Sequence, residues 1–315
     1  MAHDDPDATT IAAARERIAT YVQPVAVRRS ESLSAMVDGD VHLVCENEQP
    51  TGSFKIRGAS NAVESLLGGG VDGLTTASTG NHARAVAHVG RRHGLPVRAF
   101  VSRDVSGGRV RRLRELGADV DTTARDQTDA IRHARSYADA HGYGFIPPFD
   151  HPAVIAGQGT LGLDVAEALP VVDDVVVPVS GGGLAAGVAM ALEHTLPHVR
   201  VIGVCSDRAP SMKAALEAGR PVEVRERTTV AESLRGGLGP HNAYTFRLVR
   251  DHLDTVELVD ERAITEAQKR LSSADLLDVE GAAAAAAAYV SSHPQTFAAR
   301  HVAVMVTGAA DAADD

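Results

Sequence analysis

Short apolar runs alternate with amphipathic segments along most of this chain, and the alternation predicts its elements. The near-continuous β-branched run at 173–180 is typical of a strand buried on both faces. Further strands are predicted at 41–46, 73–78, 97–102, 118–123, 199–206 and 301–308. Helices are predicted at 9–20, 56–67, 81–94, 107–118, 126–142, 155–169, 181–194 and, because alanine is the best helix former, at 282–288.

Strand–helix alternation on this scale predicts an α/β fold with right-handed crossovers and a largely parallel sheet. Composition supports that fold, since 44% of the residues are hydrophobic but only 3% are aromatic and none is tryptophan. Such a core must be built from Val, Leu, Ile and Ala, which suits buried parallel strands covered by alanine-rich helices. The length of 315 residues predicts one large or two smaller domains.

The charge balance and the absence of long apolar runs limit the expected partners. The net charge of −10 disfavours binding to nucleic acid or to anionic membranes, and no basic patch with interleaved aromatics offsets it. No run approaches the roughly 18 apolar residues of a membrane span, and the acidic N-terminus has no apolar leader segment. A soluble, cytoplasmic protein is therefore expected. Cys45 and Cys205 lie in apolar runs and are predicted to be buried small hydrophobes.

One of only three lysines lies in a loop of small residues, PTGSFKIRG (50–58). Lysine is rare in a chain with 28 arginines, so position 55 is expected to need an amine that can lose its proton, which a guanidinium does not. Burial at a helix start, near the positive end of the helix dipole, would favour the neutral, nucleophilic form of Lys55. On this spacing alone, an ordinary surface lysine is an equal alternative.

Three further loops follow predicted strands. Glycines at 180–187 leave backbone N–H groups free to face an anion. Their spacing fits neither a nucleoside-triphosphate loop nor a dinucleotide fingerprint, so the pattern favours a single phosphate, with a tight structural turn as the alternative. The loop at 77–85 could receive a carboxylate on Ser78, Thr79 and Gly80, or could be simply a capped helix. Thr307 would lie at the carboxyl end of the sheet, where α/β proteins place ligands, although a surface turn is the alternative there.

In their order along the chain, 50–58, 77–85, 180–187 and the loop at 307, the four motifs resemble those of the fold-type-II pyridoxal-phosphate enzymes, in particular the threonine/serine dehydratase and serine racemase branch. The resemblance runs from about residue 30 to residue 311. It implies two domains of tryptophan synthase β-like fold, mostly parallel sheets flanked by helices. Residues 1–66 and 151–315 would form the large cofactor-binding domain, and 67–150 the small one. The stretches that look closest to dehydratases of hydroxyectoine use are 77–85, 147–160, 180–184, 233–239 and 279–282.

The resemblance implies pyridoxal 5′-phosphate as cofactor and assigns each motif a role. Lys55 would be the lysine that binds the cofactor covalently, flanked by Phe54. Asn81 would hydrogen-bond the phenolic oxygen of the cofactor, and Thr307 would meet its pyridine nitrogen. The phosphate would lie on Gly181, Gly182, Gly183 and Leu184. The substrate carboxylate would be surrounded by Ser78, Thr79, Gly80 and His82.

The implied reaction is elimination of the β-hydroxyl of threonine or serine, giving a 2-oxo acid and ammonia. A specialised hydroxy-amino-acid lyase, racemisation with Thr79 as the second acid/base, and a non-catalytic ligand-binding protein are the alternatives. The family's SGGN motif reads TGAA at 307–310, so that Thr307 keeps the hydroxyl but the asparagine is absent. Cys205 and Asp207 stand where cation-binding members carry acidic ligands, so no metal is expected. The resemblance also implies a homodimer that acts on a small amino acid.

Overall fold

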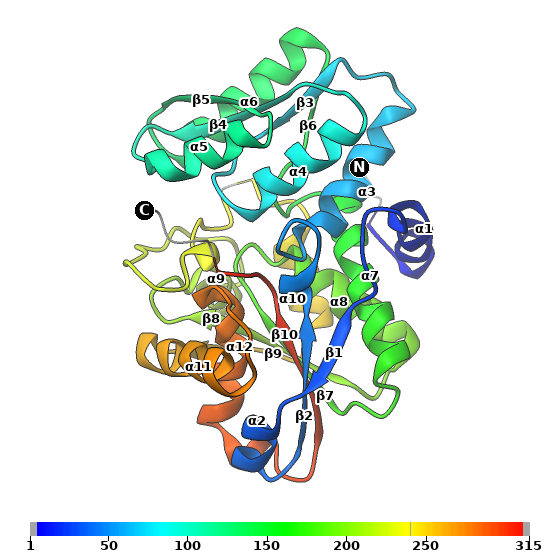
Figure 1. Cartoon of the computed structure of the whole chain (residues 1–315), viewed down its shortest axis with the longest axis vertical. Coiled ribbons are helices and arrows are strands. Elements are labelled where there is room, and N and C mark those ends of the chain that lie inside the picture. The colour runs from blue at the N-terminus through cyan, green and yellow to red at the C-terminus, as the bar shows by residue number, and fades with distance from the viewer. Residues whose placement is uncertain (1–4, 240, 311–315) are drawn as a thin grey trace.

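The computed structural model describes residues 5–239 and 241–310. Within these residues, ten strands form two sheets, one of six strands in the order β1-β2-β10-β7-β8-β9 and one of four in the order β5-β4-β3-β6 (Figure 1). Only β1 runs antiparallel to its neighbour; every other pair is parallel. The predicted α/β class with mostly parallel sheets is confirmed.

The strands of the larger sheet are β1 (Ala26–Arg29), β2 (Asp40–Cys45), β7 (Asp174–Pro178), β8 (Arg200–Ser206), β9 (Thr255–Val259) and β10 (His301–Val306). Those of the smaller sheet are β3 (Gly73–Thr76), β4 (Val97–Ser102), β5 (Asp119–Ala124) and β6 (Tyr143–Phe145). The α-helices are α1 (Ala8–Ile18), α2 (Glu31–Val37), α3 (Lys55–Leu67), α4 (Asn81–Arg92), α5 (Gly107–Glu115), α6 (Gln127–His141), α7 (Pro152–Ala168), α8 (Gly183–Thr195), α9 (Ser211–Ala218), α10 (Thr245–His252), α11 (Glu261–Ala274) and α12 (Gly281–Ser292).

Helices cover both faces of the larger sheet, as the uninterrupted apolar run of β7 predicts. Val175 and Val177 pack with the core that includes α7 and α8, whereas Val176 packs on the opposite face with α12. The alanine run Ala282–Ala288 is almost completely buried. Its short side chains let α12 approach the strands closely, which explains why a low-complexity segment is ordered here.

Glycines allow α7 and α8 to pack at close range and thereby fix where α8 begins. A Cβ at Gly187 would meet the Ile155 carbonyl and lie 2.6 Å from the Gly159 nitrogen, and a Cβ at Gly162 would lie 2.8 Å from the Val188 carbonyl oxygen. These distances are shorter than real Cβ contacts, so a larger residue would push the helices apart. The start of α8 is therefore held against α7.

Candidate cofactor site

The carboxyl ends of three neighbouring strands place three of the predicted motifs together. Because β2, β10 and β7 are adjacent and parallel, the loops that follow them leave the same edge of the sheet. The loop after β2 leads to Lys55, Thr307 directly follows β10, and the glycine loop (Ser180–Gly183) follows β7. Segments that are far apart in the sequence are thereby brought to one edge.

Backbone hydrogen bonds join the lysine loop to the loop after β10. The Phe54 N–H donates to the Thr307 carbonyl at 3.1 Å, and the Ala309 N–H donates to the Gly52 carbonyl at 2.9 Å. Gly52 has a φ of +75°, a conformation that glycine adopts without strain. Lys55 thus begins α3 from a loop whose position is fixed by the main chain. The Thr307 side chain is nearly buried, and its hydroxyl forms no hydrogen bond with another described residue.

Lys55 is half-buried, and its Nζ donates a hydrogen bond to the Pro148 carbonyl at 2.8 Å. Burial lowers the pKa of the amine to about 8, although the negative charge of Glu280 opposes the shift. A lysine of ordinary pKa would be almost fully protonated at neutral pH. The local environment therefore raises the fraction of the neutral amine that nucleophilic chemistry requires.

The motif after β3 faces this edge from the smaller sheet. Ser78 Oγ accepts the Gly80 N–H at 3.3 Å, and α4 begins at Asn81 without a side-chain cap from Gly80. Thr79 is partly exposed. The Asn81 Nδ2 donates to the Glu280 carboxylate at 2.9 Å, which links α4 to the segment before α12. This hydrogen bond therefore joins the loop region after β3 of the smaller sheet to the segment that packs beside the loop after β10.

The glycine loop has a backbone that only glycine tolerates. Gly182 has a φ of +88°, and a Cβ there would lie 2.6 Å from Met212 Cε and 2.9 Å from Val249 Cγ2. A Cβ at Gly181 would meet the Phe149 ring. No side chain caps the start of α8 at Gly183. The first N–H groups of this helix, together with its dipole, are therefore suited to an anion.

Glu280 is a site residue that the sequence reasoning did not assign a role. Its Oε2 accepts a hydrogen bond from Ser233 Oγ at 2.7 Å, and its N–H donates to the Gly308 carbonyl at 3.2 Å. A Cβ at Gly308 would lie 2.6 Å from Glu280 Oε1 and 3.2 Å from Asn81 Nδ2, so these groups converge on one point. The available signal was a single carboxylate directly before an uncharged alanine helix.

Comparison with known proteins decides the family. The family model described as pyridoxal-phosphate dependent enzyme matches residues 18–308. The chain belongs to this family. It is 38% identical over 277 residues to an L-threonine ammonia-lyase of Geobacter sulfurreducens, and the match covers 88% of this chain and 68% of the relative. The predicted family and the predicted cofactor, pyridoxal phosphate, are confirmed.

Solved structures agree with the family assignment. A threonine deaminase of T.th. superposes with a TM-score of 0.90 at 32% identity, covering 98% of this chain and 100% of the other. Maize serine racemase superposes with a TM-score of 0.89 at 31% identity, covering 97% and 94% of the two chains. The predicted fold-type-II architecture of the dehydratase and racemase branch is thereby confirmed.

The residues at the sheet edge fit pyridoxal phosphate chemically. Lys55 supplies an amine with a lowered pKa for covalent attachment to the aldehyde. The uncapped start of α8 supplies backbone N–H groups for a phosphate. Thr307 supplies a hydroxyl that is not engaged by another described residue. The amine, the anion cradle and the hydroxyl match the aldehyde, the phosphate and the ring nitrogen of this cofactor.

A buried ionic cluster anchors α3, the helix that Lys55 begins. Arg57 and Glu46 are each 1% exposed and form two hydrogen bonds of 2.8 Å, from Nε and Nη2. Arg57 also pairs with Asp164 on α7 at 2.8 Å and donates to Thr160 Oγ1 at 3.0 Å. Fully paired buried charges of this kind fix geometry, because a displaced partner would leave the other uncompensated. The cluster therefore fixes α3 against the end of β2 and against α7.

The two residues considered for a metal are a buried free thiol and a carboxylate in an ion pair. Cys205 is buried, and burial raises the pKa of its thiol to about 12; Cys45 is likewise buried and free, as predicted. Asp207 forms an ion pair with Arg227 at 3.2 Å. Across residues 5–239 and 241–310, no group of three or more His, Cys, Asp or Glu side chains could hold a metal ion.

Within residues 5–239 and 241–310, no helix has the length and apolar character needed to traverse a bilayer.

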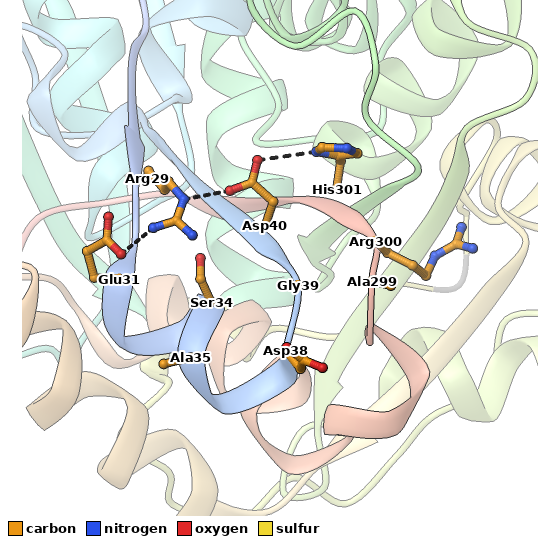
Figure 2. A pocket seen from close by; sticks show the side chains of 10 residues that line it. All are labelled: Arg29, Glu31, Ser34, Ala35, Asp38, Gly39, Asp40, Ala299, Arg300 and His301. Carbon is orange, nitrogen blue, oxygen red and sulfur yellow. Dashed lines mark hydrogen bonds and ion pairs between the residues drawn. The ribbon is translucent and has the colours of Figure 1, made fainter.

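A surface pocket of about 520 Å³ lies at the opposite end of the larger sheet, where β2 and β10 begin (Figure 2). Arg29 pairs there with Glu31 and Asp40, and Asp40 also contacts His301. Arg300 is paired with Asp174. The pocket is lined by residues at the amino ends of β2 and β10, whereas the cofactor site lies at their carboxyl ends.

Proposed function

We propose that this enzyme eliminates the β-hydroxyl of a small threonine- or serine-like amino acid and releases a 2-oxo acid and ammonia. The observation that carries the proposal is the Lys55 amine, with its pKa lowered to about 8, at an edge where a hydroxyl, Thr307, follows the neighbouring strand. A hydroxyl does not hold a pyridine nitrogen protonated as a carboxylate would. This favours prompt elimination over reactions that need a long-lived carbanion.

Pyridoxal phosphate, when bound, supplies the electron sink that makes the Cα proton of the amino acid acidic. Lys55 would accept that proton on Nζ. The Cβ–O bond then breaks, and the hydroxyl group takes up a proton and leaves as water. Hydrolysis of the released enamine gives the 2-oxo acid and ammonia.

The remaining residues of the site bind and orient. Gly181, Gly182, Gly183 and Leu184 would bind the phosphate through backbone N–H groups at the start of α8. Phe54, Asn81 and Thr307 would position the ring, and Glu280 would in turn hold the Asn81 amide. Ser78, Thr79 and Gly80 would receive the substrate carboxylate at the start of α4. The uncapped first turns of α4 and α8 support these roles.

We further propose that residues 1–66 and 151–315 form a large domain and 67–150 a small one. The strands of the smaller sheet, β3 to β6, all fall within 67–150, which supports this division. A homodimer in the cytoplasm, without nucleic-acid or membrane partners, stays a prediction from the resemblance and from the net charge of −10. Sedimentation velocity of the purified holoenzyme tests the dimer.

A substrate panel tests the function. The holoenzyme is incubated with L-threonine, L-serine, D-serine or 3-hydroxyaspartate, and 2-oxo acid and ammonia are measured together. Equal amounts of both products from at least one L-amino acid are expected. Appearance of the opposite enantiomer without 2-oxo acid would identify a racemase instead. Turnover of none of the four would contradict the proposed substrate class.

Replacing Glu280 by glutamine is expected to lower the pKa of Lys55. The negative charge of Glu280 raises that pKa, whereas burial lowers it. Removing the charge therefore leaves the effect of burial without the effect that opposes it. The neutral amine then persists to lower pH. The measurement is the rate at which cofactor-free protein couples to pyridoxal phosphate across pH. Its midpoint, near pH 8 in the wild type, should move to lower pH in Glu280→Gln but stay in Glu232→Gln, an exposed carboxylate paired with Arg109. An unchanged or higher midpoint in Glu280→Gln would contradict the expectation.

A further inference from the structure

His82 is a buried imidazole whose hydrogen-bonding state is fixed by its surroundings. It lies in the first turn of α4, is 2% exposed, and its Nε2 lies 3.1 Å from the Ile146 carbonyl oxygen. A carbonyl oxygen can only accept, so Nε2 must carry the hydrogen. The Thr76 hydroxyl donates to the same carbonyl at 2.9 Å. The hydrogen on Nε2 is therefore used in the bond to the Ile146 carbonyl and is not available to a ligand.

The other ring nitrogen is a bare acceptor. Burial first, and then the positive charge of Lys55, lower the pKa of His82 to about 3, so the imidazole is neutral at physiological pH. With the hydrogen on Nε2, the lone pair of a neutral imidazole lies on Nδ1. Nδ1 is buried and has no hydrogen-bond partner in the described chain. A buried acceptor without a partner is unfavourable, which suggests that a ligand completes it.

This state conflicts with the role that the resemblance implies for the His82 side chain. A substrate carboxylate is ionised and offers acceptors only, so it cannot bond to a nitrogen that also only accepts. The groups of a β-hydroxy amino acid that can donate are its amino group and its hydroxyl. Among the groups of such a substrate, Nδ1 can therefore accept a hydrogen bond only from one of these two.

The neighbourhood of Lys55 indicates which donor it serves. Lys55 Nζ donates to the Pro148 carbonyl, two residues beyond the carbonyl that holds His82. Both side chains therefore contact one short segment, stiffened by Pro147 and Pro148, and the charge of Lys55 affects the imidazole. A substrate amine that displaces Lys55 has to arrive where the Lys55 amine lies.

We propose that Nδ1 of His82 accepts a hydrogen bond from the amino group of the incoming substrate and orients it for exchange with Lys55. The proposal rests on the proposed function, because it requires an amino-acid substrate. His82 is then neither the acid nor the base of the reaction. It is a neutral acceptor that binds the amine and leaves the carboxylate to the start of α4.

Nitrogen NMR of the holoenzyme tests the proposal directly. Histidine is labelled with ¹⁵N, and the signals of His82 among the 14 histidines are identified by their loss in His82→Gln. In wild-type enzyme, Nε2 should be protonated and Nδ1 bare. L-alanine, which has an amine and a carboxylate but no leaving group, should move the Nδ1 signal towards that of a hydrogen-bonded nitrogen. 3-Hydroxypropionate, which has the carboxylate and the hydroxyl but no amine, should not.

Three results would overturn the proposal: a protonated Nδ1, an Nδ1 signal unmoved by saturating L-alanine, or a signal that responds to 3-hydroxypropionate instead. The holoenzyme is first reduced with borohydride, which keeps Lys55 on the cofactor and so leaves the L-alanine amine free, and saturation is established independently by equilibrium dialysis of radiolabelled L-alanine. Failure of the proposed function is distinguishable, because it is measured as absent 2-oxo acid from every amino acid of the substrate panel. An active lyase whose Nδ1 signal does not respond to L-alanine would contradict the role of His82 and leave the proposed function intact.

A matched pair of variants separates the two ring nitrogens. The terminal amide of His82→Gln can replace Nε2 and donate to Ile146 but offers nothing at the Nδ1 position. The amide oxygen of His82→Asn can replace Nδ1 as acceptor but does not reach Ile146. The glutamine variant should raise KM on the order of tenfold through the unmade hydrogen bond, and the asparagine variant should recover most of that loss. A better KM in the glutamine variant than in the asparagine variant would contradict the proposal.

Discussion

Replacing Lys55 by arginine is expected to abolish activity while the protein remains folded. The guanidinium keeps the positive charge but does not lose its proton at any working pH, so it can neither bind the cofactor covalently nor accept the Cα proton. The rate of 2-oxo acid formation should fall by a factor on the order of 10⁴ or more, as is usual when a nucleophile is removed. The absorbance band of lysine-bound pyridoxal phosphate should disappear as well.

The chain offers matched controls, because its only other lysines are Lys213 and Lys269. Lys213 pairs with Glu217 on α9, and Lys269 lies on α11. Lys213→Arg and Lys269→Arg should therefore retain both activity and the absorbance band. Circular dichroism shows whether Lys55→Arg has folded. Activity that survived in folded Lys55→Arg would remove the chemical basis of the proposal.

Replacing Arg57 by methionine is expected to lower the free energy of unfolding by about 3–5 kcal/mol, the usual effect of removing one partner from a buried ion pair. Among the residues that the structure describes, the Gln49 amide, at 3.0 Å, would then be the remaining hydrogen-bond donor to the buried Glu46 carboxylate. Because Arg57 anchors the helix that Lys55 begins, cofactor affinity should fall together with stability. Urea unfolding followed by circular dichroism measures the first effect, and equilibrium dialysis of pyridoxal phosphate measures the second.

The control is Arg15→Met, which removes an arginine from the exposed end of the same cluster. Arg15 is 40% exposed and pairs with Asp164 at 3.3 Å, and exposed pairs contribute at most about 1 kcal/mol. The double variant Arg57→Met with Glu46→Gln should recover part of the loss, since it removes the uncompensated charge. Equal destabilisation by Arg57→Met and Arg15→Met would show that the buried cluster does not anchor α3.

The sequence predicted the elements whose pattern is set by burial on both faces. The apolar run at 173–180 and the alanine run at 282–288 could be interpreted without tertiary information, and both predictions are confirmed by β7 and α12. The strands and α-helices that were not predicted are β1, α2, β6, α9, α10, β9 and α11. Several are short or half-exposed: β1 has four residues with a half-buried to exposed pattern at the edge of the sheet. Such segments are stabilised by their neighbours more than by their own periodicity.

The candidate site was predictable only as far as single loops reveal it. The amine, the glycines and Thr307 carry local signals, and the resemblance joined them. Glu280 has no local motif for its role, because its function depends on contacts with Asn81 and Ser233, which are 199 and 47 positions away. The state of His82 was equally hidden, since it depends on the Ile146 carbonyl 64 positions along the chain.

Borohydride reduction of the holoenzyme, followed by mass spectrometry of its peptides, tests the central claim most directly. Reduction fixes pyridoxal phosphate on the amine that carries it, and the three lysines lie in separate parts of the chain. The account predicts the cofactor mass on the peptide that contains Lys55 and on neither of the peptides with Lys213 and Lys269. A label on one of those two lysines, or no label on a protein supplied with the cofactor, would contradict it.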